Sequence, residues 1–84
     1  MRKLNWEIIH EYNDEQGNPT QWEADVTDSK GKKFLCISHD LDGYFYVTDL
    51  RKVFNDVAKC KSLTSAKRSA ARYLAKYDRG LLDD

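Results

Sequence analysis

The sequence is divided into short segments in which apolar and polar residues alternate, and clusters of Asp, Asn and Gly separate these segments. A period of two is typical of a strand that buries one face, because successive side chains of a strand point to opposite sides. We expect strands over residues 4–12, 21–27, 33–38 and 44–48. Turn clusters connect them, so consecutive strands should pair antiparallel as a meander.

The third expected strand contains a continuous apolar run over residues 34–37. A strand covered on both faces has this pattern, so we expect it near the centre of the sheet. In the next strand, Tyr44 and Tyr46 share one face, whereas Phe45 and Val47 share the other. We expect Phe45 and Val47 to face the core.

Residues 50–61 allow two interpretations. Apolar residues in this segment recur at helical spacing, which favours a helix. Residues 54–56 also resemble a turn that leads into a short strand over 57–61. We favour the turn and the short strand.

From Leu63 onward, apolar residues recur at the spacing of an amphipathic helix. Ser62 or Thr64 can cap its first turn, and Gly80 suits the position after its last turn. We therefore expect a helix over residues 63–79.

These segments together predict an α+β fold. An antiparallel sheet of four or five strands, over about residues 4–61, should carry the C-terminal helix on one face as a two-layer sandwich. A chain of 84 residues has room for one core, so we expect a single domain over residues 1–84 with a short tail at 80–84.

The charges of the chain cancel in total but not along its length. There are 14 Lys and Arg and 14 Asp and Glu. Residues 1–58 hold 7 basic and 11 acidic side chains, a net charge of −4, whereas residues 59–79 hold 7 basic and 1 acidic, a net of +6, and two Asp in the tail add −2. This split excludes a uniformly basic nucleic-acid binder and predicts two surfaces of opposite charge.

Two candidate binding surfaces follow from the spacing of these charges. Carboxylates that share a face of the first two strands form the acidic sheet patch: Glu7, Glu11, Glu23 and Asp25. Cations at spacings of four, four and three form the helix ridge: Arg68, Arg72, Lys76 and Arg79. Like charges at this spacing slightly destabilise an isolated helix, so helix stability does not explain the ridge.

Catalytic and metal-binding motifs give no better candidate. The sequence contains no G-x-S-x-G, no glycine-rich phosphate loop and no H-E-x-x-H, so we expect no enzyme and no cofactor. Cys36 and His39 have the spacing of a zinc pair, but a regular strand would place them on opposite faces, so we expect no metal site. Asp40-Leu41-Asp42-Gly43 lacks the flanking acids of a calcium loop and predicts a hairpin turn.

The remaining composition points to a cytoplasmic protein. Two cysteines are too few for a disulfide scaffold and suit a reducing compartment. No apolar run approaches the roughly 18 residues of a membrane-spanning helix, so we expect no membrane partner.

The segment order and the helix start Leu63-Thr-Ser-Ala-Lys-Arg-Ser-Ala-Ala71 are similar to small sheet-plus-helix DNA-binding domains of the AP2 type and of tyrosine integrases. Those domains contact DNA with a basic sheet, whereas the second strand here carries Glu23 and Asp25. The size and layout also resemble accessory proteins of phages and mobile elements, including some anti-CRISPR proteins. The second resemblance implies a protein that occupies a protein or nucleic-acid site on a larger enzyme.

Two hypotheses of function remain. The first is a non-enzymatic protein-interaction module, an accessory protein or inhibitor that binds a larger protein or nucleoprotein through its charged surfaces. The second is a nucleic-acid-binding module that holds phosphates on the helix ridge and stacks bases on Tyr44 or Tyr46. Sheet edges could also pair two copies, so either a monomer or a homodimer fits the pattern.

Overall fold

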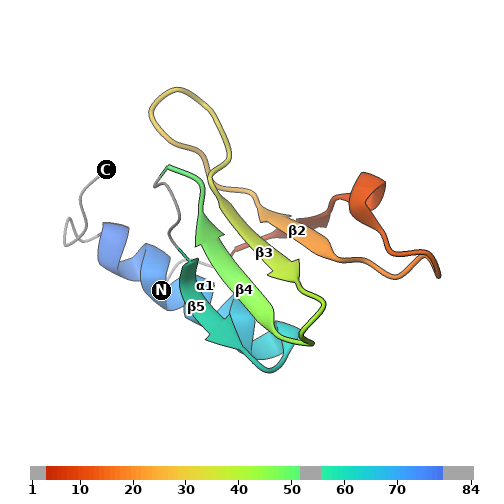
Figure 1. Ribbon diagram of the computed structural model, residues 1–84. Coiled ribbons are helices and arrows are strands. Elements are labelled where there is room, and N and C mark those ends of the chain that lie inside the picture. Colours follow the sequence, from red (N-terminus) through yellow and green to blue (C-terminus); the bar gives the residue numbers. More distant parts are fainter. Residues whose placement is uncertain (1–3, 52–55, 79–84) are drawn as a thin grey trace.

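The computed structural model describes residues 4–51 and 56–78. Within these ranges the chain forms a five-stranded antiparallel sheet in the order β1-β2-β3-β4-β5, and α1 lies across one face (Figure 1). The strands are β1 (Trp6–Ile8), β2 (Gln21–Ala24), β3 (Leu35–His39), β4 (Phe45–Asp49) and β5 (Asp56–Cys60); the 3-10 helix η1 spans His10–Tyr12 and α1 spans Leu63–Asp78. The predicted α+β meander with one C-terminal helix is confirmed.

The strand with the continuous apolar run, β3, is the middle strand of the sheet, as predicted. Leu35 and Ile37 are fully buried on its helix side. In β4, Val47 is fully buried and Phe45 packs against the core, which confirms the predicted orientation of that strand.

The segment with two interpretations contains strand β5, so the short strand is confirmed, one residue earlier than predicted, and the helix is wrong for residues 56–60. Residues 54 and 55 of the predicted turn lie outside the described residues. The register between β4 and β5 shifts once, because Val47 lies opposite Ala58 whereas Thr48 lies opposite Asp56. Val57 is therefore an extra residue on the edge strand, a β-bulge.

The first strand is shorter than predicted, since β1 ends at Ile8 and the chain then turns into η1. Ladder pairing needs a partner, and β2 begins only at Gln21, just after Pro19 and Thr20. The last bond of this ladder region runs from the Ile9 N–H to the Gln21 carbonyl, 3.0 Å. The prediction of a strand to residue 12 is therefore wrong.

Three connections use the same Asp-x-x-Gly pattern. In the turns at Asp14, Asp28 and Asp40, the glycine N–H donates to the Asp carbonyl three residues earlier, at 3.0, 3.1 and 3.0 Å. Each glycine has a positive φ of 82° to 86°, a conformation that costs other residues energy. The turn predicted in place of a calcium loop is one of these three.

Helix α1 begins at a side-chain cap. The Ser65 N–H donates to Ser62 Oγ at 3.1 Å, so Ser62 rather than Thr64 caps the first turn. The predicted cap at Gly80 lies outside the described residues.

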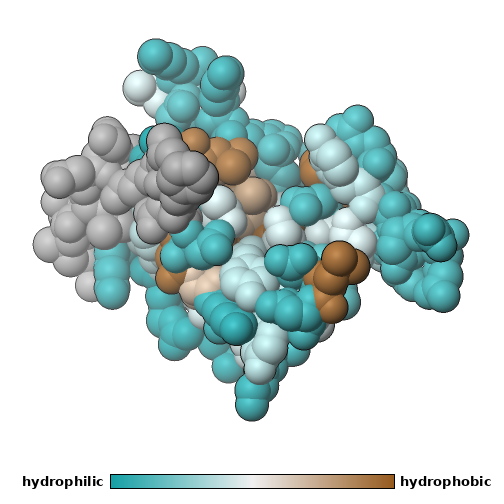
Figure 2. Space-filling view, in the orientation of Figure 1, coloured by the Kyte–Doolittle hydropathy of each residue, from teal (hydrophilic) through white to brown (hydrophobic). Residues whose placement is uncertain are grey.

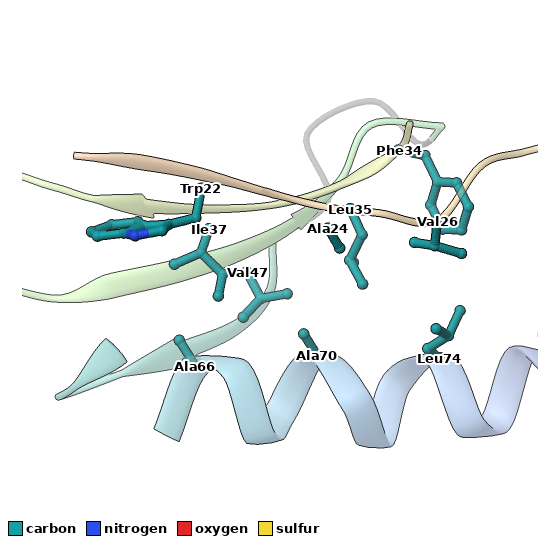
Figure 3. Close-up of a cluster of buried hydrophobic side chains, with 10 residues drawn as sticks. All are labelled: Trp22, Ala24, Val26, Phe34, Leu35, Ile37, Val47, Ala66, Ala70 and Leu74. Atoms are coloured by element: carbon teal, nitrogen blue, oxygen red, sulfur yellow. The ribbon is translucent and has the colours of Figure 1, made fainter. Parts of the chain in front are cut away.

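One stripe of α1 seals the core. Ala66, Ala70 and Leu74 recur every four residues and are at most 1% exposed. Figure 3 shows these side chains pointing from the helix toward those of the sheet, with Leu74 beneath Val26. Two alanines in this stripe let the helix backbone approach the sheet closely.

A buried carboxylate ties the end of β4 to the helix. Asp49 is 0% exposed, and Arg51 binds it with two nitrogens, Nε to Oδ1 at 3.0 Å and Nη2 to Oδ2 at 2.6 Å. The Tyr73 hydroxyl of α1 donates to Oδ2 at 2.5 Å, and the Arg51 guanidinium lies 3.9 Å from the centre of the Phe34 ring. The Arg51 backbone N–H also donates to Oδ1, at 2.9 Å, so at least four hydrogen bonds stabilise this buried charge.

Candidate partner-binding surfaces

The helix ridge lies on the side of α1 that faces away from the core. Arg68, Arg72 and Lys76 are each two residues from a buried member of the core stripe, which is a rotation of about 200° around the helix. All three are exposed. Arg79, the fourth predicted member, lies outside the described residues.

The ridge cations have no carboxylate partner in the described part of the chain, where the ion pairs that form belong to Lys33 and Arg51. The Arg72 guanidinium makes one hydrogen bond, to Ser69 Oγ at 3.4 Å. The ridge is therefore a row of positive charge that the fold does not neutralise locally, and it can attract an anionic surface.

The acidic sheet patch is only partly assembled as predicted. Glu7 and Glu23 lie directly opposite each other in the β1–β2 register, on the face away from α1. Asp25 follows the end of β2 and is exposed. Glu11 lies on η1 instead of on a strand, yet it lines the same outer-face hollow as Glu23.

Lys33 partly neutralises the acidic sheet patch, and sequence reasoning missed it. Its Nζ lies 3.2 Å from Glu7 Oε2 and 3.9 Å from Glu23 Oε1. The hydrogen bond to Glu7, together with the nearby charges of Glu23 and Asp25, raises the pKa of Lys33. The Asp28 turn was predicted and brings Lys33 opposite Thr27, but the sequence did not show the contact with Glu7, which lies on another strand.

Tyr44 and Tyr46 follow the opposite parity to the core-facing Phe45 and Val47, as predicted, but their surroundings are filled. The Lys59 ammonium lies 4.2 Å from the centre of the Tyr44 ring and 5.9 Å from that of Tyr46. The Tyr46 hydroxyl donates to Asp42 Oδ2 at 2.5 Å, and this hydrogen bond raises the pKa of Tyr46 to about 12. A base that stacks on the ring faces beside Lys59 would have to displace this side chain.

Cys36 and His39, which have the spacing of a zinc pair, lie on opposite faces of β3, as expected from the sequence. Cys36 lies in the outer-face row with Glu23, where burial raises the pKa of its thiol. His39 has the opposite parity and stacks on Phe45, with ring centres 4.1 Å apart and planes inclined by 3°. Across residues 4–51 and 56–78, no three His, Cys, Asp or Glu side chains are grouped to hold a metal ion.

The face seen in Figure 1 is mainly hydrophilic, and over its described residues the hydrophobic side chains form small separate spots (Figure 2). No described helix has both the length and the hydrophobicity to cross a bilayer. On this face the described residues form no large hydrophobic patch.

Comparison of the chain with protein-family models, with curated proteins and with solved structures finds no match. The function is consequently argued from the two charged surfaces themselves.

Proposed function

We propose that the protein is a small non-enzymatic interaction module that binds a larger protein through the helix ridge. The observation that carries this proposal is the row Arg68, Arg72 and Lys76, which is exposed and has no carboxylate partner among the described residues. Like-charge repulsion along such a row lowers the stability of the helix, and binding of an acidic surface relieves this repulsion. The partner surface is accordingly acidic.

We propose an accessory or inhibitory role in the cytoplasm, and the separation of the two charged faces supports the binding role. The ridge and the acidic sheet patch lie on opposite layers, so a partner that meets the ridge is not repelled by the carboxylates of Glu7 and Glu23. A domain of this size acts most simply by occupying a site on the partner, as an inhibitor from a phage or mobile element does. We propose that it acts as a monomer or a homodimer.

Reversal of the ridge charges should abolish capture of the partner. We expect Arg68→Glu/Arg72→Glu to reduce the amount of protein captured from a lysate of the native host by at least about tenfold, because two favourable charge contacts become repulsive. The matched control is Lys30→Glu/Lys32→Glu, which changes the net charge equally at two exposed lysines of the Asp28 turn. Quantitative mass spectrometry of the captured proteins measures the effect. Equal loss with the control pair would show that only net charge matters.

The alternative function is nucleic-acid binding by the same ridge, with weaker support because Lys59 covers the ring of Tyr44. We expect mixed-sequence single- and double-stranded oligonucleotides to bind no more tightly than about 10⁻⁴ M at physiological salt, the weak end of non-specific binding. A fluorescence titration at two salt concentrations measures this. Tight binding that weakens steeply with salt and disappears in Arg68→Glu/Arg72→Glu would establish the alternative and remove the protein-binding proposal.

A further inference from the structure

A groove runs between the edge strand β5 and the flank of α1. Its walls are Asp56, Val57 and Ala58 of β5 and Ser69, Arg72, Tyr73 and Lys76 of α1, and its volume is ≈ 440 Å³. In the described part of the chain no strand lies beyond β5, so this side of the groove opens to the surroundings.

The bulge in β5 shapes what can enter this groove. The extra residue, Val57, lies between Asp56 and Ala58, which pair with Thr48 and Val47 of β4, and it interrupts the β4–β5 ladder there. A bulge on an edge strand twists it and discourages the pairing of another strand along it. The occupant is therefore held by its side chains and not as a sixth strand.

The walls combine two cations with apolar surface. Arg72 and Lys76 are exposed, whereas Val57 and Ala58 are half-buried and pack against the core. The Asp56 carboxylate, the acidic group of the lining, already accepts a hydrogen bond from Thr48 Oγ1 at 3.1 Å. The two cations outnumber this one carboxylate, so the groove lining has a net charge of +1 beside an apolar wall.

The hydroxyl of Tyr73 is committed to Asp49, so this side chain contributes its ring to the groove and not a hydrogen-bond donor. A bare phosphate would satisfy the cations and leave the apolar wall in water. A peptide with carboxylates on both sides of an aliphatic side chain satisfies both kinds of wall.

We propose that this groove is the docking site for an acidic peptide segment of the partner, in which aliphatic residues alternate with Asp or Glu. The inference rests on the proposed function and names the kind of segment that the ridge recognises. Among the described ridge residues, Arg72 and Lys76 line the groove, whereas Arg68 does not. The inference therefore predicts unequal contributions from ridge residues that are otherwise alike.

The test is an NMR titration of the isotope-labelled protein with three capped pentapeptides, DLELD, DGEGD and KLKLK. We expect DLELD to shift amide signals of β5 and of residues 69–76, with a Kd at least about tenfold lower than that of DGEGD. KLKLK should cause no such shifts. Arg72→Glu/Lys76→Glu should raise the Kd for DLELD by at least about tenfold, and Arg68→Glu by less than about threefold.

Three outcomes would overturn the inference. Equal binding of DLELD and DGEGD would mean that charge alone is recognised, and equal weakening by Arg68→Glu would mean that the whole ridge binds without the groove. No binding of DLELD at millimolar concentration would also reject it. In each case the proposed function stands if partner capture still depends on Arg68 and Arg72, and it fails separately if capture does not.

Discussion

Asp49→Asn is expected to lower the free energy of unfolding by about 3 kcal/mol, measured by urea denaturation at neutral pH. The substitution keeps the shape of the side chain and removes its charge, which weakens the hydrogen bonds that the carboxylate accepts from Tyr73 and from Arg51, whose side chain is 10% exposed. Removing one member of a buried pair costs several kcal/mol because the other must lose water without compensation. A domain of this length has on the order of 4–12 kcal/mol of stability in total, so the loss is large.

Tyr73→Phe separates the hydrogen bond from the ion pair. It deletes the donor to Asp49 and keeps the aromatic ring, so we expect a loss of about 2 kcal/mol, the usual value for a hydrogen bond to a charged group. The double variant should lose less stability than the sum of the two single losses, because both substitutions act on the same carboxylate. Full additivity, or an Asp49→Asn loss below about 1 kcal/mol, would contradict the assigned network.

The same network predicts how stability depends on pH. Burial alone would raise the pKa of Asp49, but the hydrogen bonds from Arg51 and Tyr73 outweigh it and hold the pKa below the ordinary 3.8. The folded state then binds this proton more weakly than the unfolded state, so the contribution is present above pH 3.8 and is lost as the pH falls below it. Burial and the bond to Asp49 raise the pKa of Tyr73 from 10.0 to about 12, so its contribution is lost as the pH rises through that interval.

Leu74→Ala is expected to lower the free energy of unfolding by about 3 kcal/mol, in the middle of the range for a buried leucine. Leu74 is 1% exposed, and the other two members of its stripe are alanines, so it is the largest apolar side chain that this stripe brings to the core. The sheet side chains above it cannot fill the space without moving the helix. Arg68→Ala is the matched control on the exposed side of α1 and should change stability by less than about 0.5 kcal/mol.

Urea denaturation with a two-state fit measures the Leu74 effect, and the slope of the transition should stay unchanged. A loss of less than about 1 kcal/mol would contradict the role of α1 in sealing the core. A reduced slope would instead show that the variant has lost compactness before the main transition.

The strand order was predictable because alternation and turn chemistry are local properties. Val47 was placed correctly because Phe45 and Val47 share one face of their strand, and β3 was placed at the centre of the sheet because of its continuous apolar run. The end of β1 was not predictable in this way. Residues 9–12 alternate as a strand does. In an antiparallel pair, however, the end of β1 lies opposite the start of β2, and β2 begins only at Gln21.

The buried network was missed although part of it was visible. Val47 and Asp49 have the same parity in β4, so the period that placed Val47 inward also placed Asp49 inward. Nothing in the sequence identified Tyr73 as its donor, because that contact joins residues that are 24 apart. Lys33 was missed for a similar reason, since its partners Glu7 and Glu23 lie on two other strands.

The helix ridge was the candidate surface best defined by the sequence. Its members lie on one helix, and residues three or four apart in a helix lie on the same side of it. The acidic sheet patch depended on the pairing and extent of two strands, and Glu11 left the sheet when β1 ended early. Sites within one element are therefore predicted more securely than sites assembled from several.

The central claim is that the partner meets the molecule at the helix ridge. Photo-crosslinking of the captured complex tests it most directly, with p-benzoylphenylalanine placed at Thr64, which continues the row of Arg68 and Arg72 by four residues and is exposed. A control variant of the same protein carries p-benzoylphenylalanine at Thr27, which is exposed at the end of the β2–β3 hairpin. We predict a crosslink to the partner from Thr64 and none from Thr27. A crosslink from Thr27 alone would contradict the account.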